Sequence, residues 1–509
     1  MANDIKTPPL VILGFDVGDP DSIETWAREG YLPTMASIMR RGGWGRISGP
    51  ELVCEHGIWV SMFSGVSRSE HGYYYFRQLK PGTYDLQPTN ALDASVLPFW
   101  SCLRASGKKA AIVDVPDTRP VAGLLGAQLA DWATHYPLLS PAAEPASLLP
   151  EAHRVFGPQL KIDEKLNATF DDDRRIYRRL MERLERKGSL CRHLLARDRF
   201  DLVAIVFSEC HTASHQFWKY RPEAKVADAA ADNALLHATR DIYESIDRQM
   251  GLLLAQLPRE ANVFILSSVG MEDDYPTTGL IEAFCRQLGY QAPPESQGIS
   301  PRPIDLVRRV VPEAWRIALS RHLPREKREG LLADQFRNST NWHKTTAFAI
   351  PTSYTSFVRV NLRGREPDGI VEPGAEYEAL LNRIEADLKQ LVDPLTNEPA
   401  VSRVARTVEM FHCSPHVSLP DLFVEWKPGH FMQRVVHPEA ELKQENPDFY
   451  RPSDHSSNGF VAVAGPSIKA RGALGDISLL DLVPTFLALL DEPIPPELTG
   501  KPLQAVLGR

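Results

Sequence analysis

The stretch DLVAIVFSECHTASHQFW (residues 201–218) joins an uninterrupted apolar run to a short segment that carries two histidines. The run DLVAIV is apolar on both faces and rich in β-branched residues, which is typical of a strand buried inside a parallel sheet. His211 and His215 follow four residues apart, so a helix that begins here would place both imidazoles on one face. The sequence therefore predicts two histidines at the carboxyl end of a buried strand, where open α/β sheets bind their ligands.

Further apolar runs alternate with longer segments whose apolar residues recur at helical spacing. This alternation predicts an α/β fold with a mainly parallel central sheet and helices on both faces. Asp16 and Ser268 end two of the runs and should therefore lie at the same sheet edge as His211. The predicted strands are PLVILGFD (9–16), KAAIVDVP (109–116), DLVAIVFS (201–208), NVFILSS (262–268), PDLFVEW (420–426) and GFVAVAG (459–465), and the predicted helices include residues 21–30, 232–257 and 376–392.

Residues 286–340 interrupt the alternation. QAPPESQGISPRP is loop-like, and the dense charge cluster HLPREKREGLL follows it. We therefore predict a largely helical insertion or cap over residues 286–340. The α/β core would then consist of two parts, residues 1–285 and 341–509, and a chain of 509 residues is long enough to bury such a core.

Composition and charge limit the class of protein. Hydrophobic residues make up 43% and charged residues 24% of the chain, as in soluble globular proteins, and the net charge of −8 argues against a broad nucleic-acid surface. No secretory signal pattern precedes VILGFD, and no apolar stretch reaches the ~20 residues of a membrane helix. The six cysteines are scattered, without CxxC pairs, which fits reduced thiols. We expect a cytoplasmic protein that binds a small-molecule substrate, with neither a nucleic acid nor a membrane as partner, and with a homodimer as one option for its assembly.

Seven segments, in order, resemble landmarks of the type I phosphodiesterase / nucleotide pyrophosphatase family of the alkaline phosphatase superfamily. The resemblance covers nearly the whole chain outside the predicted insertion, and it implies an alkaline-phosphatase-like fold. The segments are VILGFDVGDPDSIETWAREGYLPTMASIMRRGGWGRI, WVSMFSGVSRSEHGYYYF, WHKTTAFAI, VNLRGREPDGIV, PDLFVEW, NGFVAVAGPSIK and DLVPTFLALLDEPIPPELTGKPL.

The resemblance implies a site with two metal ions, usually zinc, that clamp the attacking and leaving oxygens of an ester. The aspartate and histidine of the family's first metal site fall on His211 and His215, and its late histidine falls on His455. Three neutral imidazoles suit zinc, and also iron, cobalt or nickel, and they leave one position open for water or substrate. We expect one divalent ion, zinc in the first place, with iron or manganese as alternatives.

The second metal site of the family is degenerate in this sequence. Asp16 remains, but the family's adjacent Asp-His pair is replaced by Ser268 and Val269 in SSVGM. Valine cannot bind a metal and serine is a weak ligand, so a second zinc held as in the family is not expected.

The family's nucleophile, a threonine or serine, falls on Glu55 in ELVCEHGIW. Glu55 could be a nucleophile, a general base or a fourth metal ligand, and the sequence leaves these roles open. The neighbouring Cys54 is similar in place to the nucleophile of sulfatases, although their CxPxR sequence is absent. Tyr75 and Arg77, from an aromatic and basic run, and His56 are candidates for substrate binding.

These observations lead to one predicted function and two alternatives. The prediction is metal-dependent hydrolysis of a phosphoric (phosphodiester-type) or related ester, with Glu55 as base or nucleophile and Asp16 positioning a partner. The first alternative is a mononuclear His₃Glu enzyme that works as a lyase, an isomerase or an oxygen-dependent enzyme on the same scaffold. The second is a non-catalytic family member that binds a ligand. The exchange of a metal-binding aspartate for another good ligand, His211, argues against this second alternative.

Overall fold

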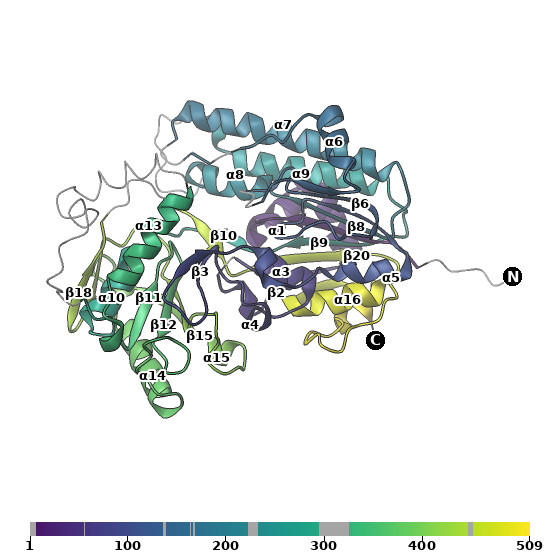
Figure 1. Cartoon of the computed structure of the whole chain (residues 1–509). Coiled ribbons are helices and arrows are strands. Elements are labelled where there is room, and N and C mark those ends of the chain that lie inside the picture. Colours follow the sequence, from purple (N-terminus) through teal and green to yellow (C-terminus); the bar gives the residue numbers. More distant parts are fainter. Residues whose placement is uncertain are drawn as a thin grey trace. The chain divides into compact units, whose positions relative to one another are not determined.

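The structure is a computed structural model of the chain (Figure 1). The chain divides into two compact units. Unit 1 consists of residues 1–73, 90–273 and 451–509, and unit 2 consists of residues 74–89 and 274–450. The structure describes residues 7–54, 56–135, 139–162, 164–165, 168–221, 233–294, 325–445 and 451–508.

Unit 1 is built around a nine-stranded sheet with the order β21-β2-β20-β9-β1-β8-β5-β6-β7. The central strands are parallel, with β1 between β8 and β9 and with β5 between β8 and β6, whereas β20 and β7 are antiparallel to their neighbours. The predicted α/β fold with a mainly parallel sheet is confirmed. The strands are β1 (Leu10–Phe15), β2 (Gly43–Ser48), β5 (Lys109–Val113), β6 (Leu125–Ala130), β7 (Ala142–Glu144), β8 (Leu202–Phe207), β9 (Asn262–Ser267), β20 (Gly459–Ala464) and β21 (Gly472–Ser478).

Alternate residues of the central strands face two separate cores. In β1, Val11 and Leu13 belong to the core under one set of helices, and Leu10 and Ile12 belong to the core under the other. Helices α1, α2, α6, α7, α8 and α9 contribute to the first core, and α3 and α16 contribute to the second, so both faces of the sheet are covered (Figure 1). Strands with two buried faces are continuous apolar runs, which explains why they could be recognised in the sequence.

The helices of unit 1 begin with local signals in the sequence. The longest, α7, starts after Thr169, whose side chain accepts from the amide of Asp172 while the Asp172 side chain accepts from the amide of Thr169. Among the described residues, no helix combines the length and the apolar character that a membrane span requires. The helices of unit 1 are α1 (Pro20–Glu29), α2 (Pro33–Arg41), α3 (Ile58–Ser64), α4 (Arg68–His71), α5 (Leu103–Ser106), α6 (Leu148–Phe156), α7 (Phe170–Leu195), α8 (Glu209–Phe217), α9 (Ala238–Leu254), α16 (Leu482–Leu489) and α17 (Gln504–Leu507).

Unit 2 contains two antiparallel sheets of four strands each, with the orders β11-β12-β16-β15 and β14-β13-β17-β18. Helices α10 and α14 share one apolar core with both sheets. The strands are β3 (Arg77–Leu79), β4 (Leu86–Pro88), β11 (Ala347–Ile350), β12 (Ser356–Val360), β13 (Val392–Asp393), β14 (Glu398–Pro399), β15 (Val401–Arg406), β16 (Leu422–Trp426), β17 (Arg434–His437) and β18 (Ala440–Lys443), and the helices are α10 (Thr278–Gln287), α13 (Arg325–Asn338), α14 (Ala375–Lys389) and α15 (Thr407–Met410).

The two units divide the chain differently from the predicted segments 1–285, 286–340 and 341–509. Residues 451–509 lie in unit 1, whereas residues 341–450 form most of unit 2. Within the predicted insertion, α13 is helical, and residues 295–324 lie outside the described residues. The helical insertion as a whole therefore stays a prediction.

Candidate metal centre

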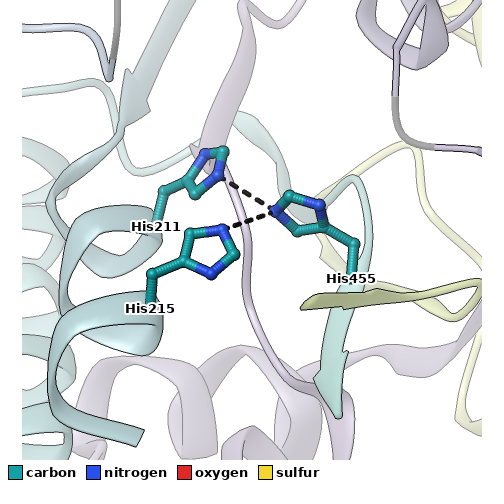
Figure 2. A group of neighbouring side chains, drawn as sticks. All are labelled: His211, His215 and His455. Atoms are coloured by element: carbon teal, nitrogen blue, oxygen red, sulfur yellow. Dashed lines mark hydrogen bonds between the residues drawn. The ribbon is translucent and has the colours of Figure 1, made fainter. Parts of the chain in front are cut away.

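Three histidines converge at the carboxyl ends of the central strands of unit 1. Helix α8 begins two residues after β8, so His211 and His215 project from one face of its first turns. His455 comes from β19 (Asp454–Ser456), which pairs with β10 (Gly270–Glu272) just beyond β9. The His455 Nε2 atom lies 3.0 Å from Nε2 of His211 and 3.1 Å from Nε2 of His215 (Figure 2).

Two carboxylates lie beside the Nδ1 atoms of the triad. The Nδ1 atom of His211 lies 3.1 Å from Oδ2 of Asp16, and Nδ1 of His455 lies 3.1 Å from Oδ1 of Asp454. Of these two contacts, the one between His211 and Asp16 is a hydrogen bond, which favours a proton on Nδ1 of His211 and leaves Nε2 of that ring for a metal ion. The Nε2 atoms of His211 and His455 are 3.0 Å apart, so one metal ion can bind to both.

Burial favours the neutral form of the third histidine, His215. Burial, and after it the positive charge of Arg451, lowers the pKa of His215 well below the ordinary histidine value. Three imidazoles from an i, i+4 helix pair and a distant strand are a donor set that zinc accepts, with a fourth position open. Among the described residues, this is the one group of at least three His, Cys, Asp or Glu side chains arranged to hold a metal ion.

Asp16, at the end of β1, connects the histidines to the rest of the sheet edge. Its Oδ1 atom accepts a hydrogen bond of 2.9 Å from Nε1 of Trp59, and its backbone carbonyl accepts from the hydroxyl of Ser268. Burial acts to raise the pKa of Asp16, but the contacts with His211 and Trp59 lower it below the usual value, so the carboxylate is ionised. Asp16 therefore acts on the site through the orientation of His211.

Replacing Asp16 with asparagine should weaken metal binding by about 10–100-fold, because the amide is uncharged and has one acceptor oxygen for the two groups that Asp16 contacts, Nδ1 of His211 and Nε1 of Trp59. A zinc titration against a competing chelator measures this change. Asp21→Asn is the control, since Asp21 is exposed and pairs with Arg46, and its affinity should equal that of the wild type. Equal affinity in both variants would mean that Asp16 does not support His211.

A second set of side chains, which the sequence did not reveal, lies beside the triad. The ring of His135 stacks on His211 with 3.7 Å between centroids, and its Nδ1 atom lies 2.8 Å from the hydroxyl of Thr212. Arg451 donates to Glu164 at 2.8 Å, and Glu164 lies 3.5 Å from Nε2 of His135. These residues come from separate segments with no common spacing, so only the folded chain identifies them.

The residues just before His211 have structural roles. Glu209 and Arg183 form a buried ion pair of 2.7 Å. The thiol of Cys210 donates to the Phe207 carbonyl at 3.1 Å, and burial raises the pKa of that thiol. Neither side chain is therefore a reactive group of the metal centre.

The segment before α3 is anchored by the buried guanidinium of Arg68. Its nitrogens donate to the backbone carbonyls of Glu51, Val53, Cys54 and His56. Cys54 is buried and has a positive φ of 69°, which is uncommon for a residue with a side chain. The next residue, Glu55, lies outside the described residues, so its predicted role stays a prediction.

The three predicted substrate-binding residues lie in different units. Tyr75 is buried in unit 2, where its ring lies 5.5 Å from that of Phe357, and Arg77 pairs with Glu329 at 2.6 Å. His56 belongs to unit 1 and adjoins the segment that Arg68 anchors. Their predicted contacts with a substrate stay predictions.

Comparisons with known proteins bear on the fold. The family described as type I phosphodiesterase / nucleotide pyrophosphatase matches residues 10–439. No curated protein matches the chain in sequence. A solved structure of phosphonoacetate hydrolase from Sinorhizobium meliloti 1021, in complex with phosphonoacetate, is similar with a TM-score of 0.51, 12% identity and 95% of each chain covered. Human ectonucleotide pyrophosphatase / phosphodiesterase 5 is similar with a TM-score of 0.48, 10% identity and 97% of each chain covered.

Proposed function

The chain belongs to the type I phosphodiesterase / nucleotide pyrophosphatase family of the alkaline phosphatase superfamily, and on that premise we propose that it hydrolyses a phosphoric (phosphodiester-type) or related ester at a mononuclear metal centre. The observation that carries the proposal is the convergence of the Nε2 atoms of His211 and His455, which lie 3.0 Å apart. His215 completes the donor set. A divalent ion bound by these nitrogens would supply Lewis-acid chemistry to the phosphoryl oxygens of the ester.

Zinc is the proposed metal, because three neutral imidazoles with an open fourth position are its common catalytic donor set. One ion is proposed because Ser268 and Val269 stand where the family has its second Asp-His pair. The hydroxyl of Ser268 donates a hydrogen bond to the backbone carbonyl of Asp16, and the side chain of Val269 is buried in the core. Neither residue supports a second ion.

Glu55 is the proposed base, nucleophile or fourth ligand. Residues before and after it in the sequence make hydrogen bonds to residues at or next to the metal centre. On one side, the Leu52 carbonyl accepts a hydrogen bond of 3.1 Å from the hydroxyl of Ser457, two residues after His455. On the other side, Trp59 donates to Asp16. A cation held by the three histidines would favour the ionised form of a neighbouring carboxylate, as the proposed role of Glu55 requires.

Glu55→Gln keeps the side-chain shape and removes the charge. If Glu55 is the base or nucleophile, hydrolysis should fall by about 10²–10⁴-fold with metal content unchanged, since general base catalysis contributes on that order. If Glu55 is a ligand, metal affinity should fall as well. Kinetics and metal analysis of the same preparation separate the two cases.

The matched control is Glu70→Gln, because Glu70 is exposed on the nearby helix α4. Its activity and metal content should equal those of the wild type. Full activity together with full metal content in Glu55→Gln would make Glu55 a bystander, and the reactive group would then have to be Cys54 or His56.

The proposed reaction is tested by removing the metal with a chelator, restoring zinc, iron or manganese, and assaying a panel of phosphodiesters that includes bis(p-nitrophenyl) phosphate. Hydrolysis should appear with one metal and disappear again on chelation. If no ester in the panel is cleaved by the metal-loaded protein, or if the metal-free protein is equally active, the proposal is wrong.

A further inference from the structure

Two adjoining cavities of unit 1 reach the surroundings of the metal centre. The larger, of about 190 Å³, is lined mainly by apolar side chains that include Trp59, Phe63 and the exposed Leu97. The smaller, of about 70 Å³, is lined partly by His135, whose ring stacks on His211. Because Trp59 also donates to Asp16, each cavity is bordered by a side chain that contacts the metal centre.

Asp117 lies in the wall that the two cavities share. Within the described part of the chain, its carboxyl makes no hydrogen bond and no ion pair. Its backbone has a positive φ of 56°, a conformation that costs energy for a residue with a side chain. A strained backbone that presents an unpaired carboxyl to a cavity suggests a use for that carboxyl.

Two neighbouring aspartates provide the contrast. Asp114 and Asp131 also have positive φ, of 50° and 58°. Asp114 accepts from the amide of Trp132 at 2.8 Å and lies 3.0 Å from the ammonium of Lys187. Asp131 accepts from the hydroxyl of Thr134 at 3.0 Å and lies near Arg119. Local bonds account for both of these carboxyls, but not for Asp117.

Asp117 is partly exposed, and its surroundings raise the pKa of its carboxyl. Burial raises the pKa of Asp117 to about 6, with His56 acting to lower it and Asp16 acting to raise it further. The other charged or titratable groups in the two cavity walls are Arg104, Arg119, Asp131 and His135. A general acid is most effective when its pKa lies near the working pH.

Resting on the proposed hydrolysis, we propose that the larger cavity holds an apolar leaving group of the ester and that Asp117 protonates the leaving oxygen. A centre with one metal ion has no second cation to stabilise the negative charge that develops on the leaving oxygen. A proton donor can neutralise this charge instead. The substrate class is accordingly a phosphodiester of an apolar alcohol or a phenol.

The step balances as follows. The bond between phosphorus and the leaving oxygen breaks, and its electron pair stays on that oxygen. The oxygen takes the proton of the Asp117 carboxyl and leaves as an alcohol, while a water molecule adds to phosphorus. The water keeps one proton on the product phosphate and releases the other to solvent, from which Asp117 is protonated again.

The experiment measures how the metal-free, full-length protein binds phenol and toluene, which differ in that toluene has a methyl group in place of the hydroxyl. In the product complex, the hydroxyl of the released alcohol donates to the Asp117 carboxylate, so phenol reproduces that complex. At pH 8, calorimetry should give phenol a Kd about tenfold or more below that of toluene, because the hydrogen bond is to a charged group. This preference should decline as the pH falls through about 6, where the carboxylate is protonated.

Asp117→Gly should remove the preference for phenol and leave toluene binding intact, since glycine adopts positive φ readily. Asp117→Asn, which also tolerates this backbone, should retain a weaker preference. Leu97→Asp should weaken the binding of both ligands, which would locate them in the larger cavity. The matched control is Asp491→Gly, an exposed aspartate with a φ of 54°, which should behave as the wild type.

The proposal is overturned if the wild type does not bind phenol saturably, if it binds phenol and toluene equally, if Asp117→Gly keeps the preference, or if Leu97→Asp leaves binding unchanged. Because the titration needs neither metal nor turnover, its result is independent of the proposed hydrolysis. If the protein prefers phenol but hydrolyses no ester, the proposed function is contradicted, whereas the cavity beside Asp117 is still supported as a binding site for a phenol. An active hydrolase without the preference would remove only the role of Asp117.

Discussion

His215→Ala is expected to lose its metal ion and to hydrolyse esters no faster than the chelated wild type. Two imidazoles would remain, and His215 Nε2 lies 3.1 Å from that of His455 at the centre of the donor set. A substitution of a residue that supports a metal ligand lowers metal affinity by about 10–100-fold. The loss in His215→Ala should be larger, because a metal ligand itself is removed. Elemental analysis after dialysis and assays of the same samples measure both effects.

The control for this variant is His343→Ala in unit 2, since the His343 side chain is exposed and takes no part in the triad. It should retain both metal and activity. Stoichiometric zinc in His215→Ala, bound as tightly as in the wild type, would show that the ion is held elsewhere.

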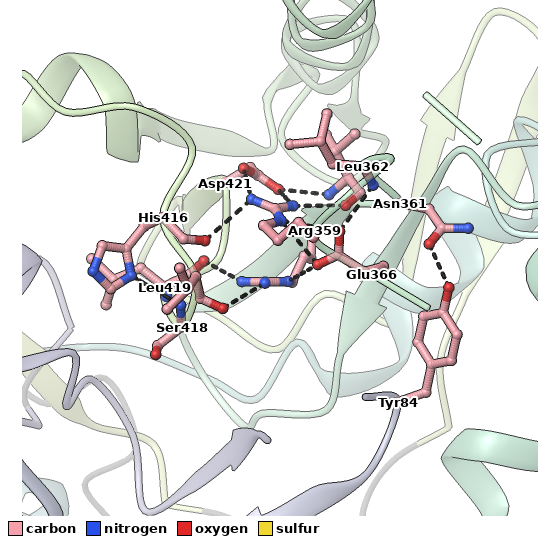
Figure 3. Close-up of polar contacts among 12 residues, drawn as sticks. Tyr84, Arg359, Asn361, Leu362, Glu366, His416, Ser418, Leu419 and Asp421 are labelled. Carbon is pink, nitrogen blue, oxygen red and sulfur yellow. Dashed lines mark hydrogen bonds and ion pairs between the residues drawn. The ribbon is translucent and has the colours of Figure 1, made fainter. Parts of the chain in front are cut away.

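Asp421→Ala is expected to lower the free energy of unfolding of unit 2 by about 3–5 kcal/mol, since it removes one of the two buried carboxylates that pair with the buried Arg365. Asp421 is 1% exposed, and it accepts two hydrogen bonds of 2.8 and 2.7 Å from Arg365 and one of 2.7 Å from Tyr377. Figure 3 shows Asp421 within a network that also contains Arg359 and Glu366, which pair at 2.6 Å. Denaturant unfolding measures the change.

Asp334→Ala is the control, because Asp334 is exposed on α13 and its loss should change stability by no more than about 0.5 kcal/mol.

The pH dependence of stability provides a second test of the role of Asp421. Burial acts to raise the pKa of Asp421, but Arg365 lowers it below the usual value. The stabilisation is therefore present above the unfolded pKa of about 3.9 and is lost as the pH falls through the folded pKa, so wild type and variant should converge in strong acid. A difference that stays constant down to pH 2, or none at pH 7, would contradict this account.

The sequence predicted the central strands well because both of their faces are buried. The apolar runs now assigned to β1, β8, β9 and β20 could be recognised from composition alone. Strand β6, LGAQLA, was missed because half of it is exposed and a glycine at positive φ interrupts it. A strand near the edge of a sheet has no continuous apolar pattern to reveal it.

The sequence could not assign strands to sheets. PDLFVEW was predicted as part of the parallel core, but β16 lies in the antiparallel sheet of unit 2, between β12 and β15. A short apolar run indicates that a strand is buried, but it does not indicate which strands lie beside it. The pairing depends on contacts between segments far apart in the chain, which a local pattern does not contain.

The candidate site could be predicted only in part for the same reason. The i, i+4 spacing of His211 and His215 after a buried strand was visible in the sequence, and the family resemblance added His455. The carboxylate partner of His455, the adjoining Asp454, and the stacked His135 had no such signal. Their places follow from the meeting of β19, α8 and the segment after β6.

The central claim is that one metal ion is held by His211, His215 and His455. Elemental analysis of the zinc-loaded protein, combined with anomalous diffraction at the zinc edge, tests this claim most directly. We predict one zinc per chain and a single anomalous peak within bonding distance of the three Nε2 atoms. Two zinc ions per chain with a second peak beside Asp16 and Ser268, or no peak at the histidines, would contradict the account.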